Sequence, residues 1–262
     1  MRVSAIQVAS THDVEENRQS LRSWVERAAQ EGSEFIVLPE ASQRRFGTGA
    51  EPLISDAESI EGPYVSTMIA LSQQFNVTIS AGIFETSREK GKAFNTTVLT
   101  EPSGSVASYR KIHLYDAFGF EESAGVVSGP VDDSNLLVRS RGGLRVGVMT
   151  CFDLRFPEMA GALLRRGATA IAIGAAWVEG PLKDEQWMTL LRARAVETTS
   201  FVIAAAQPGP NYCGRSCIVH PNGTVLAQAD KSESCVITAD LNDDELQEVR
   251  LRMPVEQGRR LR

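Results

Sequence analysis

The chain has 262 residues, 42% of them hydrophobic and 23% charged, which is ordinary for a globular protein with a sizeable core. Its 27 Lys and Arg residues against 33 Asp and Glu residues give a formal net charge of −6, which argues against a general nucleic-acid binder. Four cysteines and three scattered histidines provide neither a disulfide framework nor the ligand spacing of a metal site.

Strand and helix patterns alternate from the N-terminus. A strand over 3–9 is followed by the clearest helix, over 13–31, which Asp13 caps and Gly32 stops. A second helix opens at Gly62-Pro63, where the proline suits a first helical turn. The other elements of this half are strands, predicted over 35–38, 77–84, 95–99 and 105–110.

The alternation then repeats in the second half. Strands are predicted over 144–150, 169–174, 201–206, 217–220, 224–228 and 234–239. Helices are predicted over 157–166 and 184–198, and from about Asn242. Two similar halves without a linker indicate a single α/β domain over residues 1–262 with two packed sheets.

The sequence carries no sign of a membrane or export segment. No apolar run reaches the roughly 18 residues that a membrane span needs. Met1 runs directly into the first strand, which leaves no room for a signal peptide. We therefore expect a cytoplasmic protein that contacts neither membranes nor nucleic acid.

Three side chains with complementary chemistry follow predicted strands. Cys151 closes the run 143–150 and precedes Pro157, so its thiol lies on a strand-to-helix turn that resembles a nucleophile elbow. Glu40 and Lys111 directly follow two other strands, and ligands gather outside the carboxyl ends of strands in open α/β sheets. We expect Glu40 to take the thiol proton. Lys111 would stabilise an oxyanion and lower the pKa of the thiol.

The neighbours of these residues allow other roles. His113 offers a Cys–His pair of the papain type, although we expect it to tether its loop through the ring nitrogens. Asp153, Arg155 and Glu158 are expected to form an ion-pair network behind Cys151.

Three segments, 38–41, 109–116 and 151–158, resemble the signatures of the nitrilase, or carbon–nitrogen hydrolase, superfamily in their order and spacing. The resemblance covers nearly the whole chain and is greatest to the omega-amidase-like and deaminated glutathione amidase-like enzymes. It implies a four-layer αββα sandwich of two mixed β-sheets. It also implies the site residues Glu40, Lys111 and Cys151 as a triad, Glu122 as a supporting glutamate, the backbone N–H of Phe152 as an oxyanion donor, and Phe118 and Trp177 at the substrate.

The resemblance implies hydrolysis of a small linear amide through a cysteine thioester, releasing ammonia or an amine and a carboxylic acid, without a metal or organic cofactor. Nitrile hydrolysis and acyl transfer use the same residues and stay open, and a catalytically silent binding protein is the alternative from another class. A homodimer or larger homo-oligomer is also implied. The C-terminal arginines are candidates for reaching a partner: Arg250, Arg252, Arg259, Arg260 and Arg262.

The loop after Glu40 suggests the charge of the substrate. Arg44 and Arg45 lie within a few residues of Glu40, and arginine binds a carboxylate bidentately. We therefore expect the substrate to carry a carboxylate, as do acids handled by omega-amidase-like relatives. The alternative, favoured for either arginine singly, is that it is solvated or pairs with Glu51 and neighbouring acids.

Overall fold

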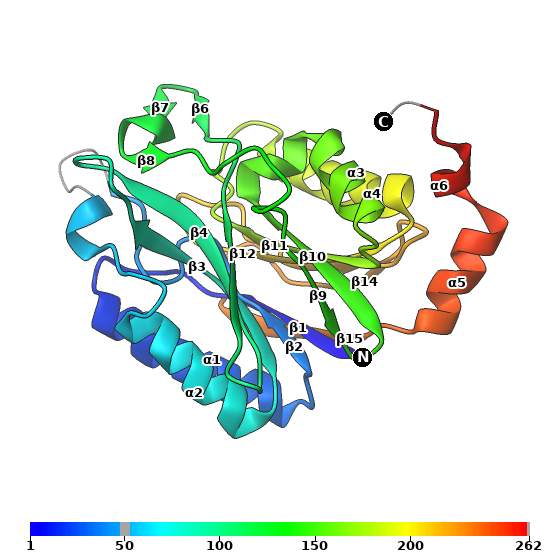
Figure 1. The fold of residues 1–262 in the computed structure, drawn as a ribbon, viewed down its shortest axis with the longest axis horizontal. Coiled ribbons are helices and arrows are strands. Elements are labelled where there is room, and N and C mark those ends of the chain that lie inside the picture. The colour runs from blue at the N-terminus through cyan, green and yellow to red at the C-terminus, as the bar shows by residue number, and fades with distance from the viewer. Residues whose placement is uncertain (48–52, 261–262) are drawn as a thin grey trace.

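The computed structural model describes residues 1–47 and 53–260, so Glu51 and Arg262 lie outside the described residues. Two mixed sheets pack face to face, and a pair of helices covers the outer face of each (Figure 1). This arrangement confirms the predicted α/β fold of two mixed sheets between helical layers.

The first sheet has the strand order β15-β1-β2-β3-β4-β5, with β8 paired to β4. Strands β1, β2 and β3 are parallel, β4 is antiparallel to β3, and β5 is antiparallel to β4, so β5 runs in the direction of β2. The strands of this sheet are β1 (Arg2–Gln7), β2 (Phe35–Val37), β3 (Thr78–Thr86), β4 (Ala93–Thr100), β5 (Val106–Arg110), β8 (Val126–Val127) and β15 (Cys235–Asp240).

The second sheet has the order β14-β13-β12-β11-β10-β9, and its three central strands β10, β11 and β12 are parallel. Their residues are almost all buried, as expected for parallel strands covered on both faces. The strands are β9 (Val138–Arg141), β10 (Leu144–Thr150), β11 (Ala170–Ala175), β12 (Phe201–Ala206), β13 (Cys217–Val219) and β14 (Val225–Gln228).

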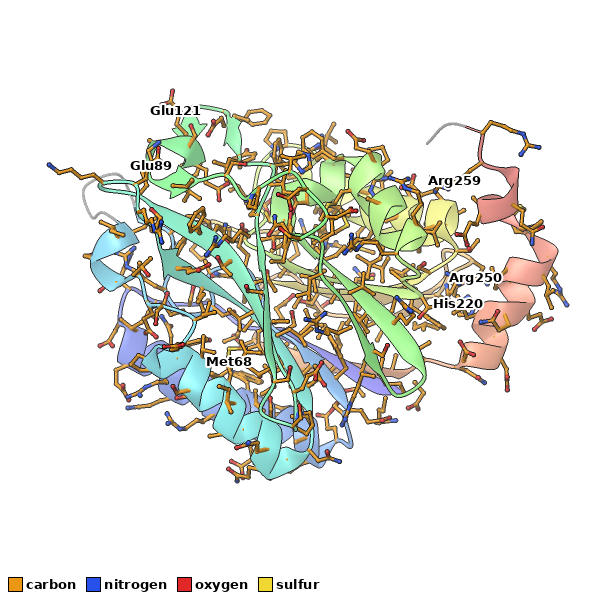
Figure 2. The ribbon with its side chains drawn as sticks, in the orientation of Figure 1. Met68, Glu89, Glu121, His220, Arg250 and Arg259 are labelled. Atoms are coloured by element: carbon orange, nitrogen blue, oxygen red, sulfur yellow. The ribbon has the colours of Figure 1, made fainter. Side chains whose placement is uncertain are left out.

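Helices α1 (Val14–Gln30) and α2 (Pro63–Phe75) lie on the first sheet, and α3 (Pro157–Arg165) and α4 (Lys183–Thr198) lie on the second. The predicted cap of α1 is confirmed, because the Asp13 carboxylate accepts hydrogen bonds from two backbone N–H groups of the first turn. Each helix buries one apolar face, and Met68 of α2 is fully buried against the first sheet (Figure 2).

The remaining elements are short or peripheral. Strands β6 (Asp116–Ala117) and β7 (Phe120–Glu121) form a separate small hairpin, and three 3-10 helices cover Leu53–Asp56, Glu122–Ala124 and Cys151–Arg155. Helices α5 (Asp243–Arg252) and α6 (Val255–Gly258) end the chain at one side of the molecule (Figure 1). No helix among the described residues is long and apolar enough to cross a lipid bilayer.

Candidate active site

The Glu40 backbone passes closely between the two sheets, shortly after β2. A Cβ atom on Gly82 of β3 would lie 2.5 Å from the backbone nitrogen of Ala41, and one on Gly174 of β11 would lie 2.9 Å from that of Glu40. Only glycine fits such approaches, so these two positions allow the segment to lie between the sheets. The Glu40 carboxylate is buried there, and its Oε2 accepts a hydrogen bond from the Ala176 N–H at 2.8 Å.

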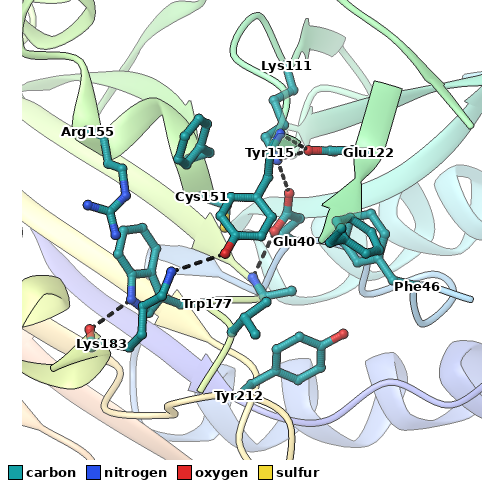
Figure 3. A pocket seen from close by; sticks show the side chains of 14 residues that line it. Glu40, Phe46, Lys111, Tyr115, Glu122, Cys151, Arg155, Trp177, Lys183 and Tyr212 are labelled. Carbon is teal, nitrogen blue, oxygen red and sulfur yellow. Dashed lines mark hydrogen bonds and ion pairs between the residues drawn. The ribbon is translucent and has the colours of Figure 1, made fainter. Parts of the chain in front are cut away.

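Lys111 lies between two carboxylates at the end of β5. Its Nζ is 2.9 Å from Glu40 Oε1 and 2.8 Å from Glu122 Oε2, and all three side chains are 1% exposed (Figure 3). Burial disfavours the charged ammonium, but Glu122 and Glu40 outweigh it and hold the pKa of Lys111 well above its usual value. An ammonium has three N–H donors, so one is left beyond the two carboxylates.

Cys151 follows β10 with a positive φ of 45°, a conformation that non-glycine residues seldom adopt outside turns and functional sites. It begins a 3-10 helix and lines the same pocket as Glu40 and Lys111. The predicted strand-to-helix turn is therefore present. Burial and the Glu40 charge raise the pKa of the Cys151 thiol well above its usual value, and the opposing effect of Lys111 is smaller. Lys111 thus lowers this pKa as expected, but burial and the Glu40 charge outweigh it.

The network behind Cys151 also differs from the expectation. Asp153 forms no ion pair with Arg155 or Glu158; its carboxylate accepts hydrogen bonds from the Tyr109 hydroxyl at 2.6 Å and the Thr150 N–H at 3.0 Å. The predicted ion-pair network was wrong because Arg155 turns outward, toward the pocket.

His113 belongs to the same network. Its ring Nδ1 lies 2.7 Å from Asp153 Oδ1, and the ring stacks on Phe156 at 3.7 Å between centroids. These contacts fix the loop that follows Lys111, as expected for a structural histidine. His113 does not line the pocket of Cys151.

The pocket above Cys151 has an open volume of about 520 Å³. Its floor is acidic, with Glu40 and Glu122, and its far wall carries Arg155, Trp177 and Lys183 (Figure 3). Phe46, Tyr115, Phe120, Phe152, Ala176, Val178 and Tyr212 complete the lining. Such a mixture of aromatic walls and a few polar groups is typical of a small-molecule site.

Of the four residues predicted to touch substrate, three do not line this pocket: Arg44, Phe118 and Arg45. Arg44 is 2% exposed, and its Nε pairs with Asp56 Oδ2 at 2.5 Å, which is the pairing with a neighbouring acid that was favoured for either arginine singly. Phe118 is 87% exposed at the tip of the β6–β7 hairpin, outside the pocket lining. Its ring contacts the Lys183 Nζ, 4.5 Å from the ring centre.

Trp177 and Arg45 are nearer to the pocket than Arg44. Trp177 lines it and is 3% exposed. Arg45 lies behind the wall, with its guanidinium 6.0 Å from the ring centre of Tyr212. Burial raises the pKa of Tyr212 to about 12, so the wall there is a neutral phenol. Arg45 therefore reaches the pocket only through Tyr212.

Two residues at the site were not predicted from the sequence: Lys183, which lines the pocket, and Asn95, which donates hydrogen bonds to Glu40 and Glu122. Lys183 is the first residue of α4, where a cation is at the unfavourable end of the helix dipole, and this mismatch is a usable signal. Asn95 lies inside a predicted strand, and nothing in the local pattern separates it from an ordinary polar strand residue.

The geometry offers a sulfur nucleophile, a carboxylate base and a buried ammonium within one pocket. Phe152 is the second residue of the 3-10 helix, so its N–H has no partner in the preceding turn. Within residues 1–47 and 53–260, no group of three His, Cys, Asp or Glu side chains could hold a metal ion.

Comparisons with known proteins point to one family. A family model described as carbon-nitrogen hydrolase matches residues 2–251. The chain is 37% identical to a deaminated glutathione amidase of Escherichia coli O157:H7 over 260 residues, which cover 99% of this chain and 97% of that protein.

Solved structures agree with the family model. A CN-hydrolase superfamily protein of Xanthomonas campestris, with an arsenic adduct in its active site, has a TM-score of 0.88 and 26% identity; the match covers 100% of this chain and 98% of that one. An amidase from Nesterenkonia sp. has a TM-score of 0.80 and 26% identity, covering 98% and 96% of the two chains.

Proposed function

Because this chain belongs to the carbon–nitrogen hydrolase family, we propose that it is an amidase that cleaves the C–N bond of small linear amides. The observation that carries the proposal is the buried Lys111 ammonium, held by Glu40 and Glu122 beside the Cys151 thiol. A binding protein without catalysis would have no need of a buried charge cluster, which is costly to assemble.

Acylation begins with proton transfer from the Cys151 thiol to the Glu40 carboxylate. The sulfur attacks the amide carbon, and the carbonyl electrons move to its oxygen, where the third N–H of Lys111 and the N–H of Phe152 stabilise the negative charge. As the intermediate collapses, the C–N bond breaks and Glu40 returns the proton to the leaving nitrogen. Ammonia or an amine departs, and the acyl group stays on Cys151 as a thioester.

Deacylation repeats the sequence with water. Glu40 takes a proton from water, the oxygen attacks the thioester carbon, and the C–S bond breaks to release the carboxylic acid. The proton on Glu40 returns to the sulfur, which restores the resting thiol. Glu122 keeps Lys111 charged and in place during both halves.

The charge of the far wall supports an anionic group on the substrate. Lys183 is 6% exposed, and its Nζ donates to the Tyr115 hydroxyl at 3.1 Å. Arg155 donates to the neutral side chain of Gln186 at 2.7 Å. Among the described residues neither cation has an acidic partner. We therefore propose that preferred amides carry a free carboxylate, bound by these two cations rather than by the loop arginines predicted above.

The test is release of ammonia or amine from a panel of short amides, with matched nitriles, methyl esters of the acidic amides, and hydroxylamine as an acyl acceptor. We expect hydrolysis of amides, a preference for the acid over its ester, and an acyl adduct on the peptide that contains Cys151 in mass spectra taken during turnover. Cys151→Ala should abolish turnover and the adduct. Full activity of this variant would refute the mechanism, and faster nitrile turnover would make the protein a nitrilase.

A further inference from the structure

Asn95 of β4 connects the two glutamates of the site. Its Nδ2 donates to Glu40 Oε1 at 2.8 Å and to Glu122 Oε1 at 2.9 Å. The side chain is 1% exposed and does not line the pocket. Together with Lys111, which contacts the same two carboxylates from another strand, it closes a ring of four buried side chains.

The orientation of the Asn95 amide reports the charge of its partners. Its Oδ1 is buried and has no hydrogen-bond partner, which ordinarily costs stability. Rotating the amide would direct Oδ1 at two carboxylate oxygens, which would leave Glu122 Oε1 without its Asn95 donor and Glu40 Oε1 with Lys111 alone. Leaving Asn95 Oδ1 without a partner therefore costs less than taking a donor away from the carboxylates. This holds when both Glu40 and Glu122 are ionised, because ionised carboxylates need donors.

The reaction requires this state of the cluster. One ammonium between two carboxylates leaves a net charge of about −1, and repulsion between the carboxylates favours taking up a proton. A proton on Glu40 would remove the base. Asn95 supplies two further N–H donors without adding a positive charge, so it steadies the carboxylates while Glu40 keeps its ability to accept the thiol proton.

We propose that Asn95 is a positioning residue that holds Glu40 and Glu122 ionised and at a fixed separation around Lys111. The inference rests on the proposed function, because it assigns Glu40 the role of base. The titratable groups that face Glu40 are Lys111 and Glu122, the Cys151 thiol, and Tyr212, which also contacts Arg45.

Asn95→Leu removes the donors at nearly constant volume. Hydrogen bonds to charged groups are worth enough that kcat/KM should fall by about 10- to 100-fold. The acid limb of the pH profile should move to higher pH by about one unit, because the carboxylates lose donors that favour their charged forms. KM should stay within about threefold, since Asn95 does not touch the pocket. Asn95→Ser retains one hydroxyl donor in a roomier site and should fall between wild type and Asn95→Leu.

Thr100→Val is the matched control. Thr100 lies on the same strand, is fully buried, and bonds Ser72 at 2.7 Å without contacting either glutamate. It should lose some thermal stability and keep the wild-type pH profile.

Alkylation of Cys151 by iodoacetamide gives a second readout that needs no substrate. At mildly acidic pH the rate in Asn95→Leu should rise to at least about threefold that of wild type, because carboxylates that protonate more readily remove the Glu40 charge that disfavours the thiolate. If no amide is turned over, the proposed function fails while this measurement still tests Asn95. A pH profile and an alkylation rate within twofold of wild type in Asn95→Ser and Asn95→Leu, or the same changes in Thr100→Val, would overturn the proposal.

Discussion

At the scale of single residues, the resting state of Cys151 determines how the site begins its reaction. The thiol is buried, the nearby Glu40 charge disfavours a thiolate, and Lys111 compensates only in part, so the pKa of the thiol is raised. A raised pKa means that little thiolate is present near neutral pH. In the mechanism that we propose, the nucleophile is therefore formed by proton transfer to Glu40 when the substrate is bound.

This state predicts the pH dependence of Cys151 modification. Because the thiolate is the reactive form and its fraction grows as pH rises toward a raised pKa, alkylation of the free enzyme should accelerate steadily from about pH 6 to about pH 9. Mass spectrometry of the alkylated peptide at a series of pH values measures this rate. A plateau that begins below neutral pH would reveal a preformed thiolate instead.

Lys111 is predicted to be irreplaceable even by arginine. The pocket between Glu40 and Glu122 encloses an ammonium that is 1% exposed, and a planar guanidinium neither fits that space nor keeps a single N–H free for an oxyanion. Losing an oxyanion donor lowers kcat by about 10²–10³. Steady-state kinetics of Lys111→Arg, with circular dichroism to verify folding, tests this, and a kcat within a few-fold of wild type would remove Lys111 from the mechanism.

Which residues could be predicted follows from what surrounds them in the chain. Glu40, Lys111 and Cys151 each follow a strand and stand inside a recognisable segment, so their convergence on one pocket could be predicted from the sequence. The partner of Arg44 could not be named from the sequence, because Asp56 belongs to a later 3-10 helix and side-chain direction in a loop has no periodicity. Asn95 could not be assigned, since its partners come from distant segments.

At the scale of elements, strands and helices with strong patterns were predicted well. Strand β12 (Phe201–Ala206) has the predicted bounds, and α4 begins one residue before its predicted start. The β6–β7 hairpin was missed because strands of two residues leave no alternation to detect. This hairpin bears Phe120 at the pocket and Phe118 beside it, so it is the element that sequence reasoning most needed.

Removing the charge at the N-terminus of α4 should weaken substrate binding without lowering the stability of the fold. Lys183 places a buried cation at the positive end of the helix, so Lys183→Met should leave thermal stability unchanged or raise it. The same change should raise KM for carboxylate-bearing amides by about 10- to 100-fold and leave their methyl esters nearly unaffected.

Thermal melts and paired kinetics on acid and ester measure the two effects of Lys183→Met. Lys231→Met is a suitable control. Lys231 is an exposed lysine that pairs with Asp184, the residue next to Lys183 in the first turn of α4, and it does not line the pocket. An equal rise in KM for the acid and the ester would show that Lys183 supports the fold of the pocket and does not bind the substrate carboxylate.

At the scale of the whole molecule, the two halves are more closely joined than the sequence pattern suggested. Strand β15, from the end of the chain, crosses to the first sheet and pairs antiparallel with β1. Residues of β1 and β2 also share one buried cluster with those of β10, β11 and β12. Neither sheet can therefore lose its partner without exposing its inner face to water.

We propose on this basis that residues 1–262 form one domain and unfold as one unit. Calorimetry should give a single transition whose calorimetric and van't Hoff enthalpies agree, if unfolding is reversible. Near-ultraviolet and far-ultraviolet circular dichroism should change at the same temperature. Two separated transitions would instead mean that the sheets are independent domains.

The C-terminal helices bear on self-association, which we propose as a property of the whole molecule. Arg250 donates to the carbonyl oxygens of Thr199 and Ala168, and Arg259 donates to that of Glu197 (Figure 2). The sequence suggested that the C-terminal arginines reach across to a partner. Arg250 and Arg259 instead bind carbonyl oxygens of their own chain. They fasten the C-terminal segment beside α4.

This segment also exposes two large apolar side chains, besides polar ones such as Arg252. Leu251 is 83% exposed and Met253 is 59% exposed, and exposed apolar side chains of this size favour burial against another surface. We expect a dimer or larger assembly by sedimentation at micromolar concentration. Leu251→Asp with Met253→Asp should shift it toward monomer without lowering the melting temperature of the monomer. The same paired change at the exposed Val131 and Leu226, which lie outside the C-terminal helices, should leave the assembly unchanged. A wild-type protein that sediments as a monomer throughout this range would refute self-association.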